Sequence, residues 1–206
     1  MRDLLLEHLT RHVGAVTTVF EEVIAGDPKL DIVHIGSSFL RRYEVVVTRG
    51  LSARPMTLPL DSKEPRFAEL LTILPKGWPV RQSAFGAENN YWPIRLLKTL
   101  GRHPFEAGTW LGFGHTHANG PSEATLKPYA QNTQLCAVAL LPSITLGERA
   151  WSYRKPDGEE VFLWAAVPLH LSELRFKQTR GVDALLDLLQ KHRVSDMIDP
   201  SRKPVV

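Results

Sequence analysis

Two histidines separated by one residue, His115 and His117, are the side chains of this sequence best spaced for chemistry. On an extended backbone, residues two positions apart point to the same side of the chain, so both imidazoles would face one way. Paired imidazoles of this kind are ligands that zinc and related metals prefer. A third ligand would have to be brought in by folding, and the candidates are Glu123, His103 and His34.

Two known metal-site patterns contain such a pair, and this sequence departs from both. JAMM metallopeptidases place a Ser-x-x-Asp seven residues after the pair, and that Asp is a zinc ligand; the matching positions here are Thr125 and Pro128. The cupin pattern needs a glycine before the pair and a glutamate after it, but Gly108 lies one place too early and Glu123 one place too late. We therefore expect no bound metal and no cofactor. A metal-dependent enzyme centred on the histidine pair is the alternative.

No other segment of the sequence completes a catalytic motif. The Gly-Ser-Ser at 36–38 lacks the Gly-x-Ser-x-Gly of a nucleophile elbow, and no Gly-x-x-x-x-Gly-Lys-[Ser/Thr] phosphate loop is present. Cys136 lies between Leu135 and Ala137, which predicts a buried thiol with a raised pKa rather than a nucleophile. These observations favour a protein that is not an enzyme.

The composition is that of an ordinary globular chain. Of its 206 residues, 43% are hydrophobic and 23% charged, which excludes disordered and collagen-like classes. The 25 Lys+Arg and 22 Asp+Glu residues are interspersed and leave a net charge of +3, so the basic face of a nucleic-acid-binding protein is not expected. A single cysteine fits a reducing compartment, and no apolar run approaches the about 20 residues of a membrane span. We expect a cytoplasmic protein that binds neither nucleic acid nor membrane.

The histidine pair must be positioned by helices and strands of the fold. The sequence predicts four helices. Apolar residues recur every three or four positions over residues 3–24, which predicts an N-terminal helix packed on the rest of the chain. The other predicted helices are 93–101, which begins at Pro93, then 172–177, capped by Ser172, and 182–192, after Gly181.

The predicted strands are rich in β-branched and aromatic residues. The turn at 156–158 predicts a hairpin, residues 49–65 read as a loop, and residues 67–74 could be a short strand or two turns of helix. The other expected strands are 31–35, 43–48, 110–113, 134–141, 151–154 and 160–167. Because helices and strands do not alternate strictly, we expect one α+β domain over residues 1–206.

A series of short motifs runs from about residue 30 to the C-terminus. Among them are Val-Thr-Arg-Gly-Leu-Ser at 47–52, Arg-Phe-Ala-Glu-Leu at 66–70, Trp-Pro-Ile at 92–94, Gly-His-Thr-His-Ala-Asn-Gly at 114–120 and Val-Ser-Asp-Met-Ile-Asp-Pro-Ser-Arg at 194–202. In this order they resemble the suppressor of fused domain family. The resemblance implies a domain with a central, mostly antiparallel sheet, and it favours a strand at 67–74.

The resemblance also implies a function. No enzymatic activity is established for such domains, and the eukaryotic members hold a transcription factor by gripping an extended peptide, partly by strand addition, between this domain and a second one. Stand-alone bacterial members look like immunity proteins of polymorphic toxin systems. We therefore expect a non-enzymatic protein-binding module that masks a protein partner, such as a toxin. A structural subunit of a larger complex is a further alternative.

The same resemblance indicates where the partner would bind. Gly114 matches a glycine of the family that precedes an acidic gripping residue, and His115 stands in place of that acid. The candidate partner contacts are therefore His115, Thr116 and Asn119. Trp78, between Gly77 and a proline, is added as a candidate exposed anchor because tryptophan is enriched at interface hot spots.

Overall fold

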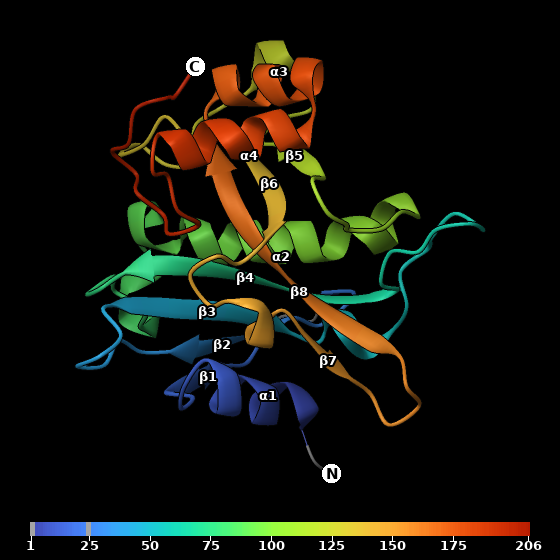
Figure 1. Cartoon of the computed structure of the whole chain (residues 1–206). Helices are drawn as coiled ribbons and strands as arrows, with labels where there is room; N and C mark the ends of the chain where they lie inside the picture. The colour runs from blue at the N-terminus through green and yellow to red at the C-terminus, as the bar shows by residue number, and fades with distance from the viewer. Residues whose placement is uncertain (1–2, 24–25) are drawn as a thin grey trace.

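A mixed β-sheet runs through the middle of the molecule (Figure 1). The computed structural model describes residues 3–23 and 26–206. Within these residues the sheet has eight strands in the order β1-β2-β3-β4-β8-β6-β5, with β7 paired to β8 off this path. The strands are β1 (Thr18–Phe20), β2 (Asp31–Ile35), β3 (Tyr43–Arg49), β4 (Phe67–Pro75), β5 (Thr116–Ala118), β6 (Ala137–Pro142), β7 (Ser152–Arg154) and β8 (Glu160–Leu169).

The pairing of the strands confirms the predicted fold class. Only β4 and β8 run parallel, and every other pair is antiparallel. The sheet is therefore mixed and mostly antiparallel, in a single α+β domain. The ambiguous segment 67–74 is a strand, as the resemblance favours, because its side chains alternate between the two apolar layers of the core.

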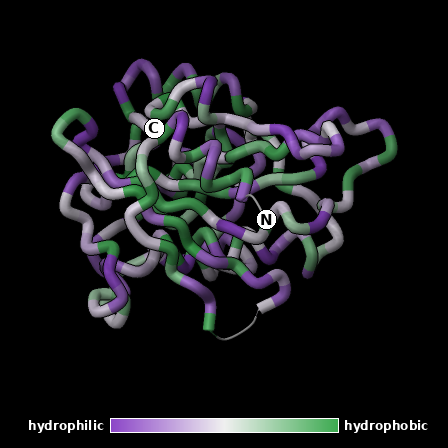
Figure 2. The backbone as a smooth tube through the Cα atoms, turned by 90° about the horizontal axis from the view of Figure 1, so that it is seen from below, coloured by the Kyte–Doolittle hydropathy of each residue, from purple (hydrophilic) through white to green (hydrophobic). Residues whose placement is uncertain are grey.

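In the described part of the chain, four α-helices cover the sheet, and they divide between its two faces (Figure 1). They are α1 (Leu4–His12), α2 (Glu88–Ala107), α3 (Leu171–Arg180) and α4 (Val182–Lys191). Trp92 and Leu97 of α2 pack on one face, whereas Leu9 of α1 and Leu185 of α4 pack on the other. Figure 2 shows the result, with hydrophobic segments gathered in the middle and most hydrophilic ones at the periphery.

The predicted helix over 3–24 is wrong beyond its first half. It ends at His12, and Gly14, at a φ of +151°, turns the chain into strand β1. The β-branched residues Val16 to Val19 favour a strand. Thr18 pairs with His34 at the edge of the sheet, so sheet pairing outweighs the helical periodicity of this segment. Residue 24 lies outside the described residues.

The helix predicted at 93–101 is longer at both ends. It spans Glu88–Ala107, so Pro93 lies inside it rather than at its start. Gly101 does not end the helix; it gives Leu30 room, because a Cβ there would lie 2.7 Å from Leu30 Cδ1. The helix ends instead at Gly108, which adopts a left-handed conformation and donates its N–H to the carbonyl of Pro104.

Two smaller predictions also need correction. Residues 110–113 form no strand, since the N–H of Leu111 is directed at Met56 Sδ rather than at a neighbouring strand. The short helix after β8 begins at Leu171, and its N-cap is His170 rather than Ser172. Glu173 there accepts the N–H of His170 at 2.8 Å, which completes a capping box. The hairpin β7–β8 and the helix after Gly181 are confirmed.

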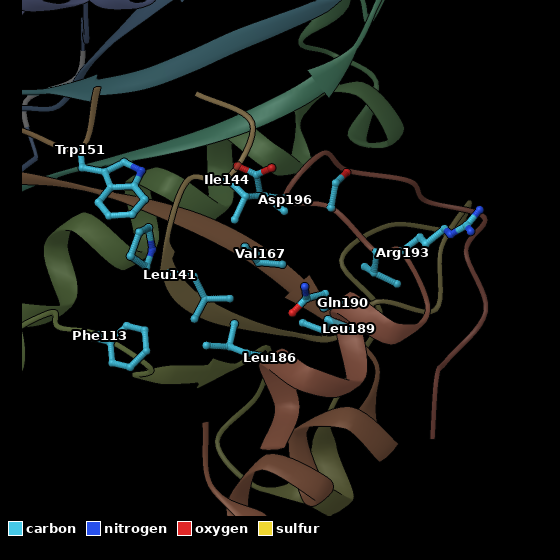
Figure 3. Close-up of a pocket in the computed structure, with 13 residues that line it drawn as sticks. Phe113, Leu141, Ile144, Trp151, Val167, Leu186, Leu189, Gln190, Arg193 and Asp196 are labelled. Atoms are coloured by element: carbon cyan, nitrogen blue, oxygen red, sulfur yellow. The ribbon is translucent and has the colours of Figure 1, made fainter. Parts of the chain in front are cut away.

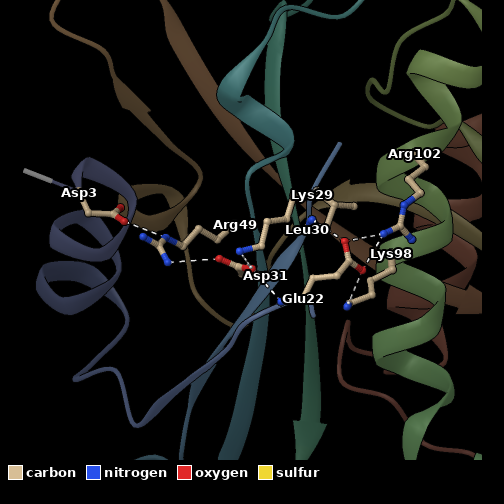
Figure 4. A network of polar contacts seen from close by, with 8 residues as sticks. All are labelled: Asp3, Glu22, Lys29, Leu30, Asp31, Arg49, Lys98 and Arg102. Atoms are coloured by element: carbon tan, nitrogen blue, oxygen red, sulfur yellow. Dashed lines mark hydrogen bonds and ion pairs between the residues drawn. The ribbon is translucent and has the colours of Figure 1, made fainter. Parts of the chain in front are cut away.

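A chain of polar contacts ties α1, the first strands and α2 together (Figure 4). Arg49 binds Asp3 at 2.8 Å and Asp31 at 3.4 Å. The carboxylate of Glu22 accepts hydrogen bonds from Lys98 at 2.8 Å and Arg102 at 2.6 Å, and both of these residues belong to α2. These contacts hold the C-terminal half of α2 in place, and that half also contributes to the candidate site described next.

Candidate functional site

Strand β5 is a free edge of the sheet. It pairs only with β6, so no strand among the described residues is bonded to its other side. The carbonyl of His115 accepts the N–H of Leu140, and the N–H of Asn119 donates to the carbonyl of Cys136. The odd-numbered residues from 115 to 119 are therefore the ones whose backbone groups bond to β6 and the residue before it. In an antiparallel pair the alternate residues point their N–H and C=O groups away from the partner strand. Thr116 and Ala118 therefore direct their backbone polar groups to the open side.

A sharp turn at Gly114 sets the start of this edge strand. Gly114 has a φ of +70°, a conformation that favours glycine, and its N–H donates to the carbonyl of Leu140. A Cβ at this position would lie 2.9 Å from Val182 of α4. The glycine thus allows α4 to pack directly against the turn from which β5 begins.

A half-open pocket of about 300 Å³ lies beside β5. His115 and His117 both line it, as the prediction that their rings share a face requires. His103 of α2 and Lys177 of α3 line it as well, so helices from both faces of the sheet reach this edge. In Figure 1, β5 accordingly lies between α2 and α3.

The rings in this pocket contact one another. The ring of His117 lies 5.0 Å from that of His103 at an angle of 72°, and the ring of His115 lies 5.1 Å from Trp110. Burial lowers the pKa of His117 below its ordinary value, and the nearby His103 lowers it further. At neutral pH the ring of His117 is therefore mainly uncharged.

Of the three side chains predicted as a third metal ligand, only His103 approaches the pair. Glu123 forms an ion pair with Arg175, and His34 binds Glu44 at 2.9 Å on β2 and β3. Within residues 3–23 and 26–206, no three His, Cys, Asp or Glu side chains are grouped as metal ligands.

The other predicted partner contacts fall in different places. Thr116 lies on the edge strand and lines the pocket. The side-chain amide of Asn119 donates to the carbonyls of Lys127 at 2.8 Å and Pro128 at 3.3 Å, so it closes the loop after β5. Trp78 lies in the loop after β4 and does not line the pocket beside β5. Its ring packs edge-on against Trp92, and its Nε1 donates to the carbonyl of Asn90. Its role as an exposed anchor stays a prediction.

Cys136 lies directly before β6, opposite this edge. Its side chain is buried, and burial raises the pKa of its thiol, as the sequence predicts. Nothing about its position suggests a nucleophile, because the thiolate form is the reactive one.

Sequence reasoning missed an apolar groove of about 560 Å³ on the face that α1 and α4 only partly cover (Figure 3). Leu141, Val167 and Leu189 form part of its lining, and the partly exposed Phe113 and Ile144 stand on its rim. Phe113 and Ile144 each lie in a loop, where a single apolar residue is common and predicts nothing by itself.

In the part of the chain that the structure describes, no helix has the length and apolar character needed to cross a bilayer.

The sequence matches the family model described as Suppressor of fused protein (SUFU) over residues 26–203. No curated protein matches it.

Several solved structures share this fold at low sequence identity. A SUFU homologue of Neisseria gonorrhoeae FA 1090 is 15% identical with a TM-score of 0.69, and the match covers 98% of this chain and 94% of that one. A chain of the Sufu-Fu complex is 18% identical with a TM-score of 0.67, over 98% and 91%. Drosophila Suppressor of Fused is 17% identical with a TM-score of 0.63, and the match covers 98% of this chain but 50% of that protein.

Proposed function

This chain belongs to the suppressor of fused family, and from that membership we propose that it is a non-enzymatic module that binds and masks a protein partner through the open side of β5. The observation that carries the proposal is the pair of outward-directed residues, Thr116 and Ala118. In the register of β5 with β6, both N–H groups are directed away from β6. An extended segment of a partner would satisfy both residues by adding a strand, which is a recurring mode of peptide recognition.

The neighbouring side chains provide the specificity. A strand added beside β5 passes along the pocket lined by His115, His117 and Lys177. His115 and Thr116 are then direct partner contacts, whereas Asn119 acts by holding the loop that follows β5. Main-chain bonds would supply the affinity and this pocket the selection among partners.

The comparisons support a partner that is a protein. One relative of this fold was solved as the Sufu-Fu complex. Another relative of this fold is a bacterial SUFU homologue, from Neisseria gonorrhoeae. Together with the resemblance to bacterial stand-alone members, this favours an immunity protein that neutralises a toxin in the cytoplasm.

The test is affinity capture of the tagged chain from its native host, with two variants at one position. Ala118→Pro removes the outward N–H, and an edge strand tolerates proline where that N–H faces solvent. Ala118→Thr keeps the N–H and is the matched control. We expect one stoichiometric partner with the wild type and with Ala118→Thr, and its loss with Ala118→Pro. Equal recovery with all three chains would refute binding at this edge.

The toxin role has its own test. The captured partner, expressed alone, should arrest growth, and co-expression of the wild-type chain should restore it, whereas Ala118→Pro should not. A partner that leaves growth unaffected would remove the immunity role and leave the binding role standing.

A further inference from the structure

The pocket beside β5 has an unusual charge pattern. Its lining includes one permanent cation, Lys177, and three side chains that become cations on protonation: His103, His115 and His117. No carboxylate is among the residues that line it. None of these four side chains has a hydrogen-bond or ion-pair partner within residues 3–23 and 26–206. The pocket therefore holds several donors that nothing in the described chain satisfies.

Glu123 and Glu64, from two neighbouring loops, are not among the residues that line the pocket. Glu123, in the loop after β5, is occupied by Arg175 of α3. Glu64 belongs to the loop that packs beside residues 109–112, where its carboxylate lies against Gly112 and outside the pocket lining. The charged and imidazole side chains that line the pocket from α2, from β5 and its preceding turn, and from α3 are thus all basic.

We propose that this pocket receives an acidic side chain from the partner segment that pairs with β5. The inference rests on the proposed function and names the chemistry of the partner. Successive side chains of a strand point to opposite faces of a sheet, so every second residue of an added strand would face the side of α2. A carboxylate there could accept hydrogen bonds from the imidazole of His117 or His103 and from the ammonium of Lys177.

Binding of the acid is coupled to protonation of His117. Without the ligand, burial and the neighbouring ring of His103 keep the pKa of His117 low. A carboxylate in the pocket places a negative charge beside the ring of His117 and favours its imidazolium form. Binding of the carboxylate is therefore accompanied by uptake of a proton. Affinity for an acidic segment should therefore rise as the pH falls below 6.5 and His117 takes up its proton.

The test uses N-acetyl-glutamate N-methylamide as the probe, with the glutamine analogue as its neutral isostere. Histidine rings of the full chain are followed by NMR between pH 5 and 8. We expect the glutamate probe to raise the pKa of His117 by about half a unit or more, because a carboxylate within hydrogen-bonding distance favours the charged ring. The glutamine probe should leave it unchanged.

Variants at the pocket locate the effect. Lys177→Gln and His103→Gln should each weaken the glutamate probe severalfold, whereas Lys191→Gln, in the last turn of α4 and outside the pocket, should not. Equal effects of the two probes, equal shifts at the distant His192, or unchanged binding in Lys177→Gln and His103→Gln would overturn the proposal.

The outcome separates this inference from the proposed function. If Ala118→Pro abolishes partner binding but Lys177→Gln and His103→Gln do not weaken it, the edge is the binding site and the acid pocket is refuted. If Ala118→Pro leaves the partner bound, the edge is refuted, while the probe titration still reports on the pocket.

Discussion

The imidazole of His117, on the edge strand β5, lies 5.0 Å from the imidazole of His103, near the end of α2. These residues are 14 positions apart in sequence, and the loop between them contains the turn at Gly114. The contact joins the free edge of the sheet to the helix that covers one of its faces. The geometry of the candidate binding site therefore depends on how α2 is held.

The first prediction concerns the titration of His117. Burial and His103 lower its pKa below 6.5. The unfolded chain then binds a proton more readily than the native one, so the free energy of unfolding should fall as the pH drops below about 6.5. His103→Gln should raise the pKa of His117, while burial still keeps it below 6.5. NMR titration of the two chains measures both values, and a native His117 that titrates at or above 6.5 would contradict this account.

The second prediction concerns Glu22, which holds α2. Burial alone would raise its pKa, but hydrogen bonds from Arg102, the N–H of Leu30 and Lys98 lower it to about 2. Its stabilising contribution is therefore present above pH 4.5 and lost as the pH falls towards 2. Glu22→Gln should cost about 1–3 kcal/mol at neutral pH, because two cations lose their charged partner.

Urea unfolding at several pH values checks this, with the exposed neighbour substitution Glu21→Gln as the control. The wild type and Glu22→Gln should differ at pH 7 and converge as the pH approaches 2. A constant difference across that range would show that the charge of Glu22 contributes nothing.

The third prediction concerns the turn that begins β5. Gly114→Ala adds a Cβ 2.9 Å from Val182 at a residue with a φ of +70°. Gly77→Ala is the matched control, since Gly77 has a φ of +84° but nothing within 4 Å of the added atom. Backbone strain should cost Gly77→Ala about 1–2 kcal/mol, and the clash should raise the cost for Gly114→Ala to about 2–4 kcal/mol. Equal losses of stability in urea would show that Val182 moves aside freely.

The fourth prediction concerns the C-terminal segment that braces α3, the helix carrying Lys177. Glu173 is buried and accepts Arg202 Nη1 at 2.5 Å and Nη2 at 2.6 Å. Burial raises the pKa of Glu173, but Arg202 and the N–H groups of His170 and Val205 together lower it below its ordinary value, so the carboxyl stays charged. Arg202→Ala leaves that charge unpaired and should cost about 3–5 kcal/mol.

The exposed Arg180, in the last turn of the same helix, is the control for this experiment. Arg180→Ala should change the free energy of unfolding by less than about 0.5 kcal/mol. If the two substitutions cost the same, the buried pair does not brace α3.

The strands could be predicted well from the sequence, because β-branched runs such as 31–35 and 43–48 have few alternatives. Errors came where tertiary pairing overrides local periodicity. Residues 13–23 have helical spacing, yet β2 offers Thr18 and its neighbours an edge to pair with. Likewise, Pro93 reads as a helix start, but the packing of Trp92 on the sheet extends the helix upstream.

The candidate site could be predicted only in part. The spacing of His115 and His117 predicts one shared face, which the structure confirms. Neither the free edge of β5 nor the approach of His103 and Lys177 could be read from the sequence, because both depend on strand order and on the placement of two separate helices. Asn119 reads as a contact residue, although its amide is used within its own loop.

The most direct test of the central claim is amide hydrogen exchange of the full chain with and without the captured partner. An added strand would use the N–H groups of Thr116 and Ala118 as donors. The account predicts that exchange at these two amides slows strongly on binding. Unchanged exchange at both, with protection instead around the apolar groove at Phe113 and Ile144, would contradict it and place the partner on the other face of the sheet.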